Sequence, residues 1–586
     1  MTYRKRGRAR CVQIQIYSQG EYPDAEYARD GSSLADNGCG LFTLNHAMQW
    51  VGMSDVPSPE SMARTDMKKG LLGFDAGYFS ASAETYGFLA EDLYPCCNSR
   101  EQFRARIEQL FSQGHAVTLH VRGDNGFTGR QTSGHYLLGV GITADKSKVH
   151  IIDSSSGTTL GILKNSEYNG YYFSDGILKP IDKSWDRATT IRAVTGNKAS
   201  DYASGAEYWV DFDFVWFNQR FYDGGDNDSG WTVAIMRKTR SARIRVVGDI
   251  MVCTSQLEVC RDSGYDFHPE FEYIRDMLSN ADYTMANMEG TVGKHDRWPY
   301  SGYPQFNCPE TILEALKDSG VDFLTLANNH MLDRLFTGLK NTVFWVEQYG
   351  FDHIGAYRTR EERDAAHVYT VNGIRIGFVA YTYFTNEIEI IYKELDPAAT
   401  EYGVPYIFNS DFADDIRRLR EAGAEVVIAF PHCGTEYVQQ PDASQLEYAE
   451  RLAAAGADII LGSHSHAVQP MTLRRVTDSA GRSRDVLTAF SLGNFLSDHR
   501  LQYTDCGVII EFTISENSDG IFSVGGVGYI PTYCWQPVRG DVRVLPSGKY
   551  LKEGPEGMTK EAHARLVQSY GEITGIIGDA YPVLET

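Results

Sequence analysis

Acidic, amide and imidazole side chains follow a series of apolar, strand-like runs in the second half of this 586-residue chain. The candidate ligands at these strand ends are Asp249, Glu289, Asn329, His432, His464 and His466. These residue types hold Mn, Fe or Zn in hydrolytic sites. Side chains beyond the carboxyl ends of strands in an α/β domain can share one site. The pattern therefore predicts one or two divalent metal ions that activate water and bind the oxygens of a phosphoryl or acyl group.

Two of the imidazoles lie on one short loop, within the segment Gly-Ser-His-Ser-His at 462–466. Alternate positions on an extended segment point the same way, so we expect His464 and His466 to face one site. Each residue alone has an ordinary interpretation: a hydrogen-bonded loop histidine, a turn former at Asp249, or a helix cap at Glu289. The combination favours the metal site. The same strand ends also present Asn287, Asp333, Glu436 and Asn494.

A cysteine precedes a helical pattern in the first half of the chain. Apolar residues recur at helical spacing over 41–51, which places Cys39 at a helix N-terminus, where the helix dipole favours a thiolate. His135 opens an apolar strand and Asp153 ends the next. This order predicts a nucleophile, a base and an orienting carboxylate, with Gln19 donating to an oxyanion hole. The alternative is a small core residue, a strand-start residue and a turn former.

The elements that must position these residues differ between the two halves. Residues 1–240 contain short strand-like runs separated by turn residues, whereas 241–586 alternate apolar strands with amphipathic helices. Strands are expected at 244–249, 321–327, 376–381, 426–430 and 459–462, and helices at 411–422, 445–455 and 560–570. The predicted class is α/β (α+β), with two domains joined by the polar stretch 237–243.

Composition excludes several classes of protein. With 55 Lys and Arg against 77 Asp and Glu, the net charge of −22 disfavours nucleic acid and anionic membrane surfaces as partners. Ten cysteines are too few for a disulfide scaffold. No window has the length and apolarity of a membrane-spanning helix, and no signal peptide is visible, so we expect a cytoplasmic protein.

The second-half motifs resemble the CapA-type poly-γ-glutamate capsule-synthesis family. They are Gly-Asp at 248–249, Asn-Met-Glu at 287–289, Ala-Asn-Asn-His at 327–330, His-Cys-Gly-Thr-Glu-Tyr at 432–437, the 462–466 segment and Ser-Leu-Gly-Asn-Phe at 491–495. The resemblance spans about 243–515. It implies a calcineurin-like metallophosphoesterase fold, a β-sandwich flanked by helices, with the six candidate ligands in metal positions. It also implies that His330 donates a hydrogen bond or proton to the phosphoryl group or leaving oxygen.

The sequence departs from the phosphoesterase pattern at the first motif. Where a phosphoesterase has Asp-x-His, Asp249 is followed by Ile250 and Met251, which leaves the first metal subsite short of a ligand. Glu289 stands where a bridging aspartate is usual. Cys433 follows His432 and could be a soft ligand or a buried thiol.

The first-half motifs resemble the papain-like cysteine peptidases related to the leader peptidases of bacteriocin exporters. The resemblance rests on residues 11–160 within the first domain, although Leu41 and Phe42 replace the usual Pro-Thr. It implies Cys39 as nucleophile, His135 as base, Asp153 as orienting residue and Gln19 as oxyanion donor.

Together these observations favour a two-domain hydrolase linked to poly-γ-glutamate or capsule synthesis or processing. The metal-dependent domain would act on a phosphoester or a γ-glutamyl-type polymer, so the expected partner is a peptide-like or phosphorylated polymer. The alternative is a non-catalytic factor that assembles or binds the polymer, with only the cysteine peptidase domain active.

Overall fold

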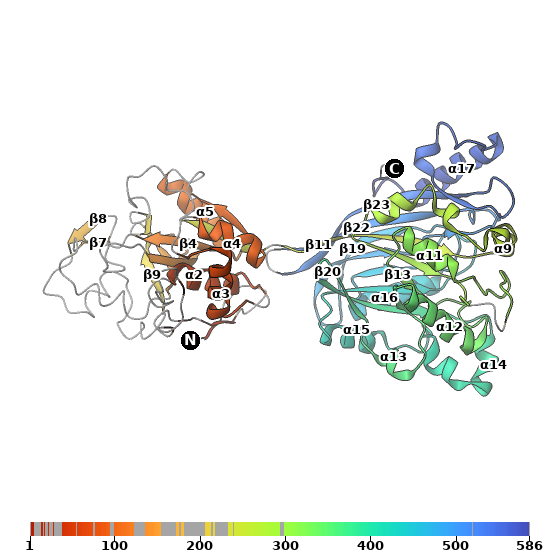
Figure 1. The fold of residues 1–586 in the computed structure, drawn as a ribbon, viewed down its shortest axis with the longest axis horizontal. Helices are drawn as coiled ribbons and strands as arrows, with labels where there is room; N and C mark the ends of the chain where they lie inside the picture. The colour runs from red at the N-terminus through yellow and green to blue at the C-terminus, as the bar shows by residue number, and fades with distance from the viewer. Residues whose placement is uncertain are drawn as a thin grey trace. The chain divides into compact units, whose positions relative to one another are not determined.

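The computed structural model divides the chain into two compact units, Met1–Thr239 with Ser518–Ile521, and Arg240–Asn517 with Phe522–Thr586. It describes residues 2–4, 13–15, 17, 22, 27, 38–53, 56–73, 77–93, 99–121, 135–153, 171–174, 177–180, 206–212, 215–216, 232–237, 239–293, 298–517 and 520–584. Helices and strands occur in both units (Figure 1), so the predicted mixed α/β composition is confirmed.

The first unit contains a six-stranded antiparallel sheet with the order β3-β10-β4-β5-β6-β9. Its strands are β3 (Phe88–Asp92), β10 (Val233–Arg237), β4 (Ala116–Val121), β5 (His135–Ile142), β6 (Lys148–Asp153) and β9 (Ala206–Asp211). Two further pairs are β1 (Thr2–Arg4) with β2 (Gln13–Gln15), and β7 (Tyr171–Ser174) with β8 (Ile177–Pro180). The helices are α2 (Cys39–Trp50), α3 (Pro59–Lys69), α4 (Tyr78–Tyr86) and α5 (Arg100–Ser112).

Both faces of this sheet are covered. Along β5, Tyr136 and Leu138 pack in the core cluster that contains α2, whereas Leu137 packs in the cluster that contains α5. This alternation follows from the two-residue repeat of a strand. The hydroxyl of Thr43 in α2 donates a hydrogen bond of 3.2 Å to the carbonyl oxygen of Tyr136. Helix α2 is therefore attached to the sheet close to the beginning of β5.

The second unit contains two sheets. The first has the order β14-β13-β12-β11-β22-β23-β24, and the second the order β15-β16-β17-β18-β20-β19. The first comprises β11 (Ser241–Ile250), β12 (Tyr283–Met288), β13 (Phe323–Thr325), β14 (Asp352–Ile354), β22 (Cys506–Glu516), β23 (Phe522–Trp535) and β24 (Arg543–Pro546), with β21 (Asn494–Leu496) paired to β11. The second comprises β15 (Val368–Val371), β16 (Ile374–Thr382), β17 (Val426–His432), β18 (Ile459–Leu461), β19 (Met471–Thr477) and β20 (Ser483–Ala489).

Helices of the second unit follow most of its parallel strands. They are α9 (Thr254–Cys260), α10 (Arg275–Ser279), α11 (Thr311–Asp318), α12 (Leu335–Gln348), α13 (Arg360–Asp364), α14 (Ile388–Leu395), α15 (Phe412–Glu421), α16 (Ala443–Ala455) and α17 (Lys560–Ile577). Shorter helical turns are η3 (Arg261–Ser263), η4 (His268–Phe271), η5 (Ala399–Gly403) and η6 (Ser547–Tyr550). The helices expected at 411–422, 445–455 and 560–570 correspond to α15, α16 and α17.

The two sheets pack face to face and form the centre of four layers. Phe323 of β13 lies 4.4 Å from Phe378 of β16 and 5.8 Å from Phe430 of β17, measured between ring centroids. These residues belong to an apolar cluster between the two sheets. A second apolar cluster joins the outer face of the first sheet to α9–α12, and a third joins the second sheet to α15 and α16. Because the central strands are buried on both faces, they read as continuous apolar runs in the sequence.

The polar stretch 237–243, which was predicted to join the two domains, also contributes residues to the second unit. Ser241 to Arg243 already belong to β11, where they pair with β22, and Ala242 is fully buried. Arg240 contacts Glu425 and Glu516 at 2.8 Å each, so it joins the two sheets by ion pairs. Arginine is suited to this role because its planar guanidinium can pair with two carboxylates at a sheet edge.

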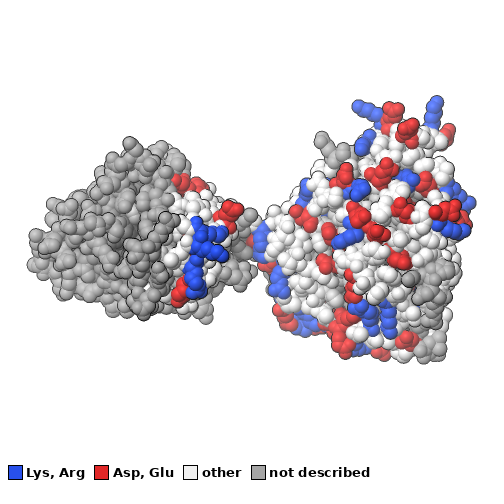
Figure 2. All heavy atoms as spheres, in the orientation of Figure 1, with Lys and Arg blue, Asp and Glu red and all other residues white. Residues whose placement is uncertain are grey.

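Charged side chains of both signs are interspersed over the described surface of the second unit on the face drawn in Figure 2. Within the described parts of the chain, no helix combines the length and apolarity that crossing a membrane requires.

One buried carboxyl group in this unit predicts a pH dependence of stability. Burial raises the pKa of Glu270 in η4 from 4.5 to about 8, although Gln256 donates a hydrogen bond of 3.2 Å to it. Between these values the folded chain holds a proton that the unfolded chain has lost, so stability falls as pH rises. Replacing Glu270 by Gln removes this loss. The free energy of unfolding of Glu270→Gln should exceed that of wild type by a margin that grows from pH 5 to pH 8 and then levels, on the order of 5 kcal/mol at most, and thermal unfolding at each pH measures it.

The matched control is Glu272→Gln, which changes an exposed carboxylate two residues away. A difference between Glu270→Gln and wild type that stays constant from pH 5 to pH 8 would contradict the prediction.

Candidate metal centre

The six predicted metal ligands converge at the carboxyl ends of strands from both sheets of the second unit. Asp249 lies in β11, Glu289 follows β12, Asn329 follows β13, His432 ends β17, and His464 and His466 follow β18. All six side chains are buried. Parallel pairing of β11, β12 and β13 aligns three strand ends, and parallel pairing of β17 with β18 aligns the others. Face-to-face packing of the sheets then brings the two sets of ends together.

Two glycines in the motifs permit close approach of backbones at this edge. A Cβ atom on Gly248 would lie 2.0 Å from the carbonyl oxygen of Gly493, and one on Gly462 would lie 2.0 Å from that of Phe490. Asp249 N–H donates to the same Gly493 oxygen at 3.0 Å. Any side chain at either glycine would push the ligand-bearing segments apart.

One group of ligands surrounds His432. Ligand atoms of Glu289, His432 and His464 lie within 4.8 Å of one another. His432 Nε2 is 2.8 Å from Asn329 Oδ1 and 3.7 Å from Glu289 Oε1. Its other nitrogen, Nδ1, is 2.7 Å from the hydroxyl of Ser463. Such an outer hydrogen bond orients a histidine so that the opposite nitrogen can bind a metal.

A second group surrounds His466. Ligand atoms of Asp249, Glu289 and His466 lie within 4.8 Å of one another. His466 Nδ1 is 3.0 Å from Asn494 Oδ1 and 3.2 Å from Asp249 Oδ2. The contact with Asn494 leaves Nε2, 3.7 Å from Glu289 Oε1, as the ligand atom. Glu289 belongs to both groups and therefore stands between the two candidate positions.

The histidines reach the centre by a different backbone geometry from the one predicted. His464 and His466 have φ values of +92° and +54°, so the 462–466 loop is not an extended segment with alternating side chains. Their ring centroids nevertheless lie 6.1 Å apart. Positive φ is costly for a residue other than glycine and concentrates at functional sites. Convergence here is produced by a strained turn, which alternation along the sequence could not reveal.

The cluster contains buried polar atoms whose bonding capacity the described residues leave unused. Asp249 Oδ2, Glu289 Oε1 and His464 Nδ1 form no hydrogen bond of standard geometry within the described parts of the chain, although the two oxygens face ring nitrogens at 3.2–3.7 Å. Burial, and then the charge of Asp249, raise the pKa of Glu289 well above its usual range. Adjacent buried carboxylates require a compensating positive charge. Carboxylate, amide and imidazole donors fit a divalent Mn, Fe or Zn ion, so the residues present suit such an ion.

The histidines respond to the same surroundings in opposite directions. Burial lowers the pKa of His432 well below its usual value and that of His464 to about 4, and neighbouring histidines add to both effects. Burial alone would also lower the pKa of His466, but Glu289 and Asp249 outweigh it and raise this pKa to about 9. Neutral His432 and His464 are ready to act as ligands, whereas His466 partly neutralises the carboxylates.

His330 lies beside the centre and is buried. Its Nδ1 atom is 2.8 Å from Asp333 Oδ2, and its ring meets that of Phe306 edge to face at 4.7 Å. Asn386 lies between His330 and the cluster. Its amide nitrogen is 3.2 Å from His330 Nδ1, and its amide oxygen accepts a hydrogen bond of 3.1 Å from Asn329. Because Asp333 holds Nδ1, the Nε2 atom of His330 is available to a substrate.

The structure also identifies residues that were not assigned as ligands. Asn287 donates to Asp249 at 2.8 Å, and Asn494 and Ser463 contact one ring nitrogen each of His466 and His432, two of the candidate ligands. Glu436 groups with His464 and His466. Their positions after strands were the available signal, but their roles depend on the fold. Cys433 packs in the apolar cluster between the second sheet and its helices, which makes it a buried thiol rather than a ligand.

The structure only partly describes the candidate residues of the first unit. Cys39 is the first residue of α2 and is half-buried. His135 begins β5 and Asp153 ends β6, and these antiparallel strands are neighbours. Gln19 and the side chains of His135 and Asp153 lie outside the described residues. The proposed nucleophile, base, orienting residue and oxyanion donor therefore remain predictions.

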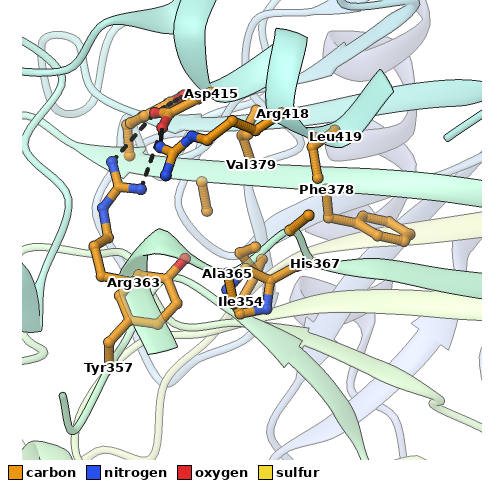
Figure 3. A pocket seen from close by; sticks show the side chains of 13 residues that line it. Ile354, Tyr357, Arg363, Ala365, His367, Phe378, Val379, Asp415, Arg418 and Leu419 are labelled. Carbon is orange, nitrogen blue, oxygen red and sulfur yellow. Dashed lines mark hydrogen bonds and ion pairs between the residues drawn. The ribbon is translucent and has the colours of Figure 1, made fainter. Parts of the chain in front are cut away.

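A separate pocket lies between α13, α15 and the second sheet (Figure 3). Arg363 and Arg418 both contact Asp415, and Tyr381 donates to it at 2.9 Å. Because these charges satisfy one another, the pocket has the character of a structural ion-pair network.

Comparison with known proteins relates the second unit to capsule synthesis. Residues 243–499 match the family model described as "Bacterial capsule synthesis protein PGA_cap". The capsule biosynthesis protein CapA of Bacillus anthracis is 26% identical over 291 residues, which cover 49% of this chain and 67% of that protein. The PGA biosynthesis protein CapA of Bacillus subtilis (strain 168) is 26% identical over 282 residues, or 47% and 69% of the two chains. The predicted resemblance is confirmed over 243–499.

Solved structures match at low overall similarity. A hypothetical protein from Thermus thermophilus has a TM-score of 0.27 and 17% identity, covering 49% of this chain and 98% of that one. The calcineurin-like phosphoesterase YfkN from Bacillus subtilis has a TM-score of 0.28 and 14% identity, covering 58% and 99%.

Because Glu289 belongs to both ligand groups, we expect its negative charge to stabilise the folded protein only when a metal is bound. In protein treated with a chelator, Glu289→Gln should be at least as stable as wild type, because burial and the charge of Asp249 disfavour the ionised form of Glu289 and raise its pKa. With Mn²⁺ added at 100 times the wild-type Kd, wild type should gain about 2.7 kcal/mol, and the variant much less. Thermal unfolding with chelator and with Mn²⁺ measures both effects.

Glu447→Gln, an exposed change on α16, is the control and should gain as much from Mn²⁺ as wild type. Full Mn²⁺-dependent stabilisation of Glu289→Gln would show that this carboxylate is not a ligand.

Proposed function

We propose that the second unit is a metal-dependent hydrolase whose centre is formed by Asp249, Glu289, Asn329, His432, His464 and His466. The observation that supports this proposal is the convergence of six buried candidate ligand side chains, three of which carry a buried polar atom that forms no hydrogen bond within the described residues. A bound divalent ion would supply Lewis-acid polarisation of a substrate oxygen and activation of water.

The protein's own residues supply the remaining functions. His330 Nε2 donates a proton to the leaving oxygen or nitrogen, and Asp333 holds the ring in the required orientation through Nδ1. Asn386 accepts a hydrogen bond from Asn329 and packs beside the His330 ring. Ser463 and Asn494 fix the rings of His432 and His466 from outside. The backbone turns at 464 and 466 hold the two imidazoles before any ligand arrives, which lowers the reorganisation that catalysis requires.

The substrate class follows from the relatives rather than from the geometry. The two CapA relatives are named for capsule or PGA biosynthesis, so we propose a γ-glutamyl-type or phosphorylated capsule polymer, or a precursor of one. The second candidate for this unit is polymer assembly or binding without catalysis. The missing histidine after Asp249, where buried Ile250 and Met251 stand, favours it.

The two candidates differ in what the loss of His464 or His466 does. We expect His464→Ala and His466→Ala each to bind Mn²⁺ or Zn²⁺ at least about tenfold more weakly than wild type. Hydrolysis of a phosphoester such as bis-p-nitrophenyl phosphate, or of poly-γ-glutamate, should fall by at least about a hundredfold. Elemental analysis and turnover assays on purified protein measure these changes.

His563→Ala, a substitution on α17, is the control and should leave metal content and turnover unchanged. Metal loss in the two variants with retained polymer binding and no wild-type turnover would favour the assembly factor. Wild type that takes up no divalent metal would refute both the centre and the hydrolase.

For the first unit we propose a cysteine peptidase or amidase activity with Cys39 as nucleophile. The observation that favours it is the position of Cys39 at the first residue of α2. Thr43 in the same helix donates a hydrogen bond to the carbonyl oxygen of Tyr136, the residue after His135. His135 would act as base, Asp153 would orient it, and Gln19 would donate to the oxyanion.

An activated thiol should react at mildly acidic pH. We expect iodoacetamide at pH 6 to label Cys39 at least about tenfold faster than glutathione, because an ordinary thiol of pKa ~8.5 is mostly protonated there. His135→Ala should slow the labelling. Mass spectrometry of the peptide that contains Cys39 measures the rate for this thiol alone. Labelling no faster than glutathione in wild type would show that Cys39 is not activated.

A further inference from the structure

Glu436 provides a third carboxylate at the metal centre, from the loop that follows β17. One of its oxygens lies within 4.8 Å of ligand nitrogens of His464 and His466. Asp249 and Glu289 are fully buried, whereas Glu436 is partly exposed. It therefore approaches the two histidines from the solvent side of the centre.

Contacts on both sides hold Glu436 in place. The preceding Thr435 donates a hydrogen bond of 2.9 Å to Asp442, the residue that caps α16. The following Tyr437 donates from its backbone N–H to Ser465 at 2.7 Å, and its ring lies 6.1 Å from that of His466 in a stacked orientation. Tyr437 has a φ of +64°, which a residue with a side chain rarely adopts. The segment 435–437 is thus hydrogen-bonded to the 462–466 loop, called here the histidine loop, and Glu436 lies between two residues that are held by hydrogen bonds.

The two ligand groups are unequal without this carboxylate. The group around His432 has four members, since Asn329 joins Glu289, His432 and His464. The group around His466 has only Asp249 and Glu289 beside it. The two residues that follow Asp249 offer no ligand, because their apolar side chains are buried in the core cluster of the first sheet.

An unsatisfied atom at the histidine loop points to a ligand on this side. His464 is 2% exposed, and its Nδ1 atom has no hydrogen-bond partner in the described part of the second unit. Burying such an atom without a partner costs free energy. Glu436 lies within 4.8 Å of a ligand nitrogen of His464 as well as of His466, so a cation that Glu436 helps to hold would lie beside the loop that carries this unsatisfied atom.

We propose that Glu436 is the missing ligand, so that the centre binds two divalent cations in unlike subsites. Glu289, Asn329, His432 and His464 hold one cation. Asp249, Glu289 and His466 hold the other, with Glu289 shared, and Glu436 completes it from the side of His464 and His466, the two residues that it lies beside. This proposal rests on the metal centre proposed above.

The second subsite is rich in carboxylate oxygens. Three carboxylates and one imidazole form a hard donor set, which suits Mn²⁺, whereas the first subsite has two imidazoles. Partial exposure of Glu436 also leaves a coordination position on the solvent side for a substrate oxygen. The solvent-facing subsite is therefore expected to be the weaker one and the one that a substrate meets.

Calorimetric titration of chelator-treated protein with Mn²⁺ tests the proposal. Wild type should bind two Mn²⁺ per chain. Glu436→Gln, which keeps the size and removes the charge, should retain one tight site and bind the second Mn²⁺ at least about tenfold more weakly. Glu436→His, which restores a ligand atom, should recover the second site for Zn²⁺. Glu447→Gln is the control for loss of an exposed carboxylate and should behave as wild type.

The possible outcomes distinguish the role of Glu436 from the existence of the metal centre on which it rests. Two sites in Glu436→Gln with affinities within about twofold of wild type would overturn the role of Glu436 while leaving the metal centre intact. One site in both proteins would also overturn it. Wild type that binds no cation would refute the metal centre itself. Unchanged thermal midpoints in chelator show that neither variant loses binding through misfolding.

Discussion

The second unit is organised around two carboxylates, Asp249 and Glu289, that are buried side by side at the ends of neighbouring strands. Buried negative charges of this kind are unfavourable unless a positive charge lies between them. In the protein alone, burial and Asp249 raise the pKa of Glu289, and the two carboxylates raise the pKa of His466, so both shifts act to reduce the net negative charge. The unpartnered oxygens and nitrogen nearby are explained by the same requirement, because a divalent cation would engage all of them.

The four-layer packing makes this arrangement possible. Each sheet supplies half of the ligands, and the aromatic contacts of Phe323 with Phe378 and Phe430 hold the sheets face to face. Core residues between the sheets and under the helices are almost wholly buried, so the strand ends cannot drift apart without opening the core. The free energy gained by burying these apolar layers therefore offsets the cost of the strained backbone at the candidate metal centre. The positive φ values of His464, His466 and Tyr437 all occur at the edge where the ligands meet.

The first unit shows how much a catalytic inference depends on side chains. Its backbone places Cys39 at the start of a helix and His135 and Asp153 in adjacent strands of one sheet. Tyr136 and Leu138 pack toward α2 while Leu137 packs toward α5, so the strand presents different residues to its two helical layers. A sequence motif specifies the order of such residues, but the chemistry depends on which of them meet in space.

The sequence alone predicted the strands, the main helices and the polar side chains that end the strands of the second unit, because apolar strands that are buried on both faces leave a continuous hydrophobic pattern whose ends are marked by polar residues. It could not predict the turns at His464 and His466, the sheet-edge role of Arg240, or the grouping of Glu436 with the histidine loop. Those features depend on contacts between segments far apart in the chain. A local pattern records which residues are apolar or polar, whereas only packing of the two sheets decides which polar residues face one another.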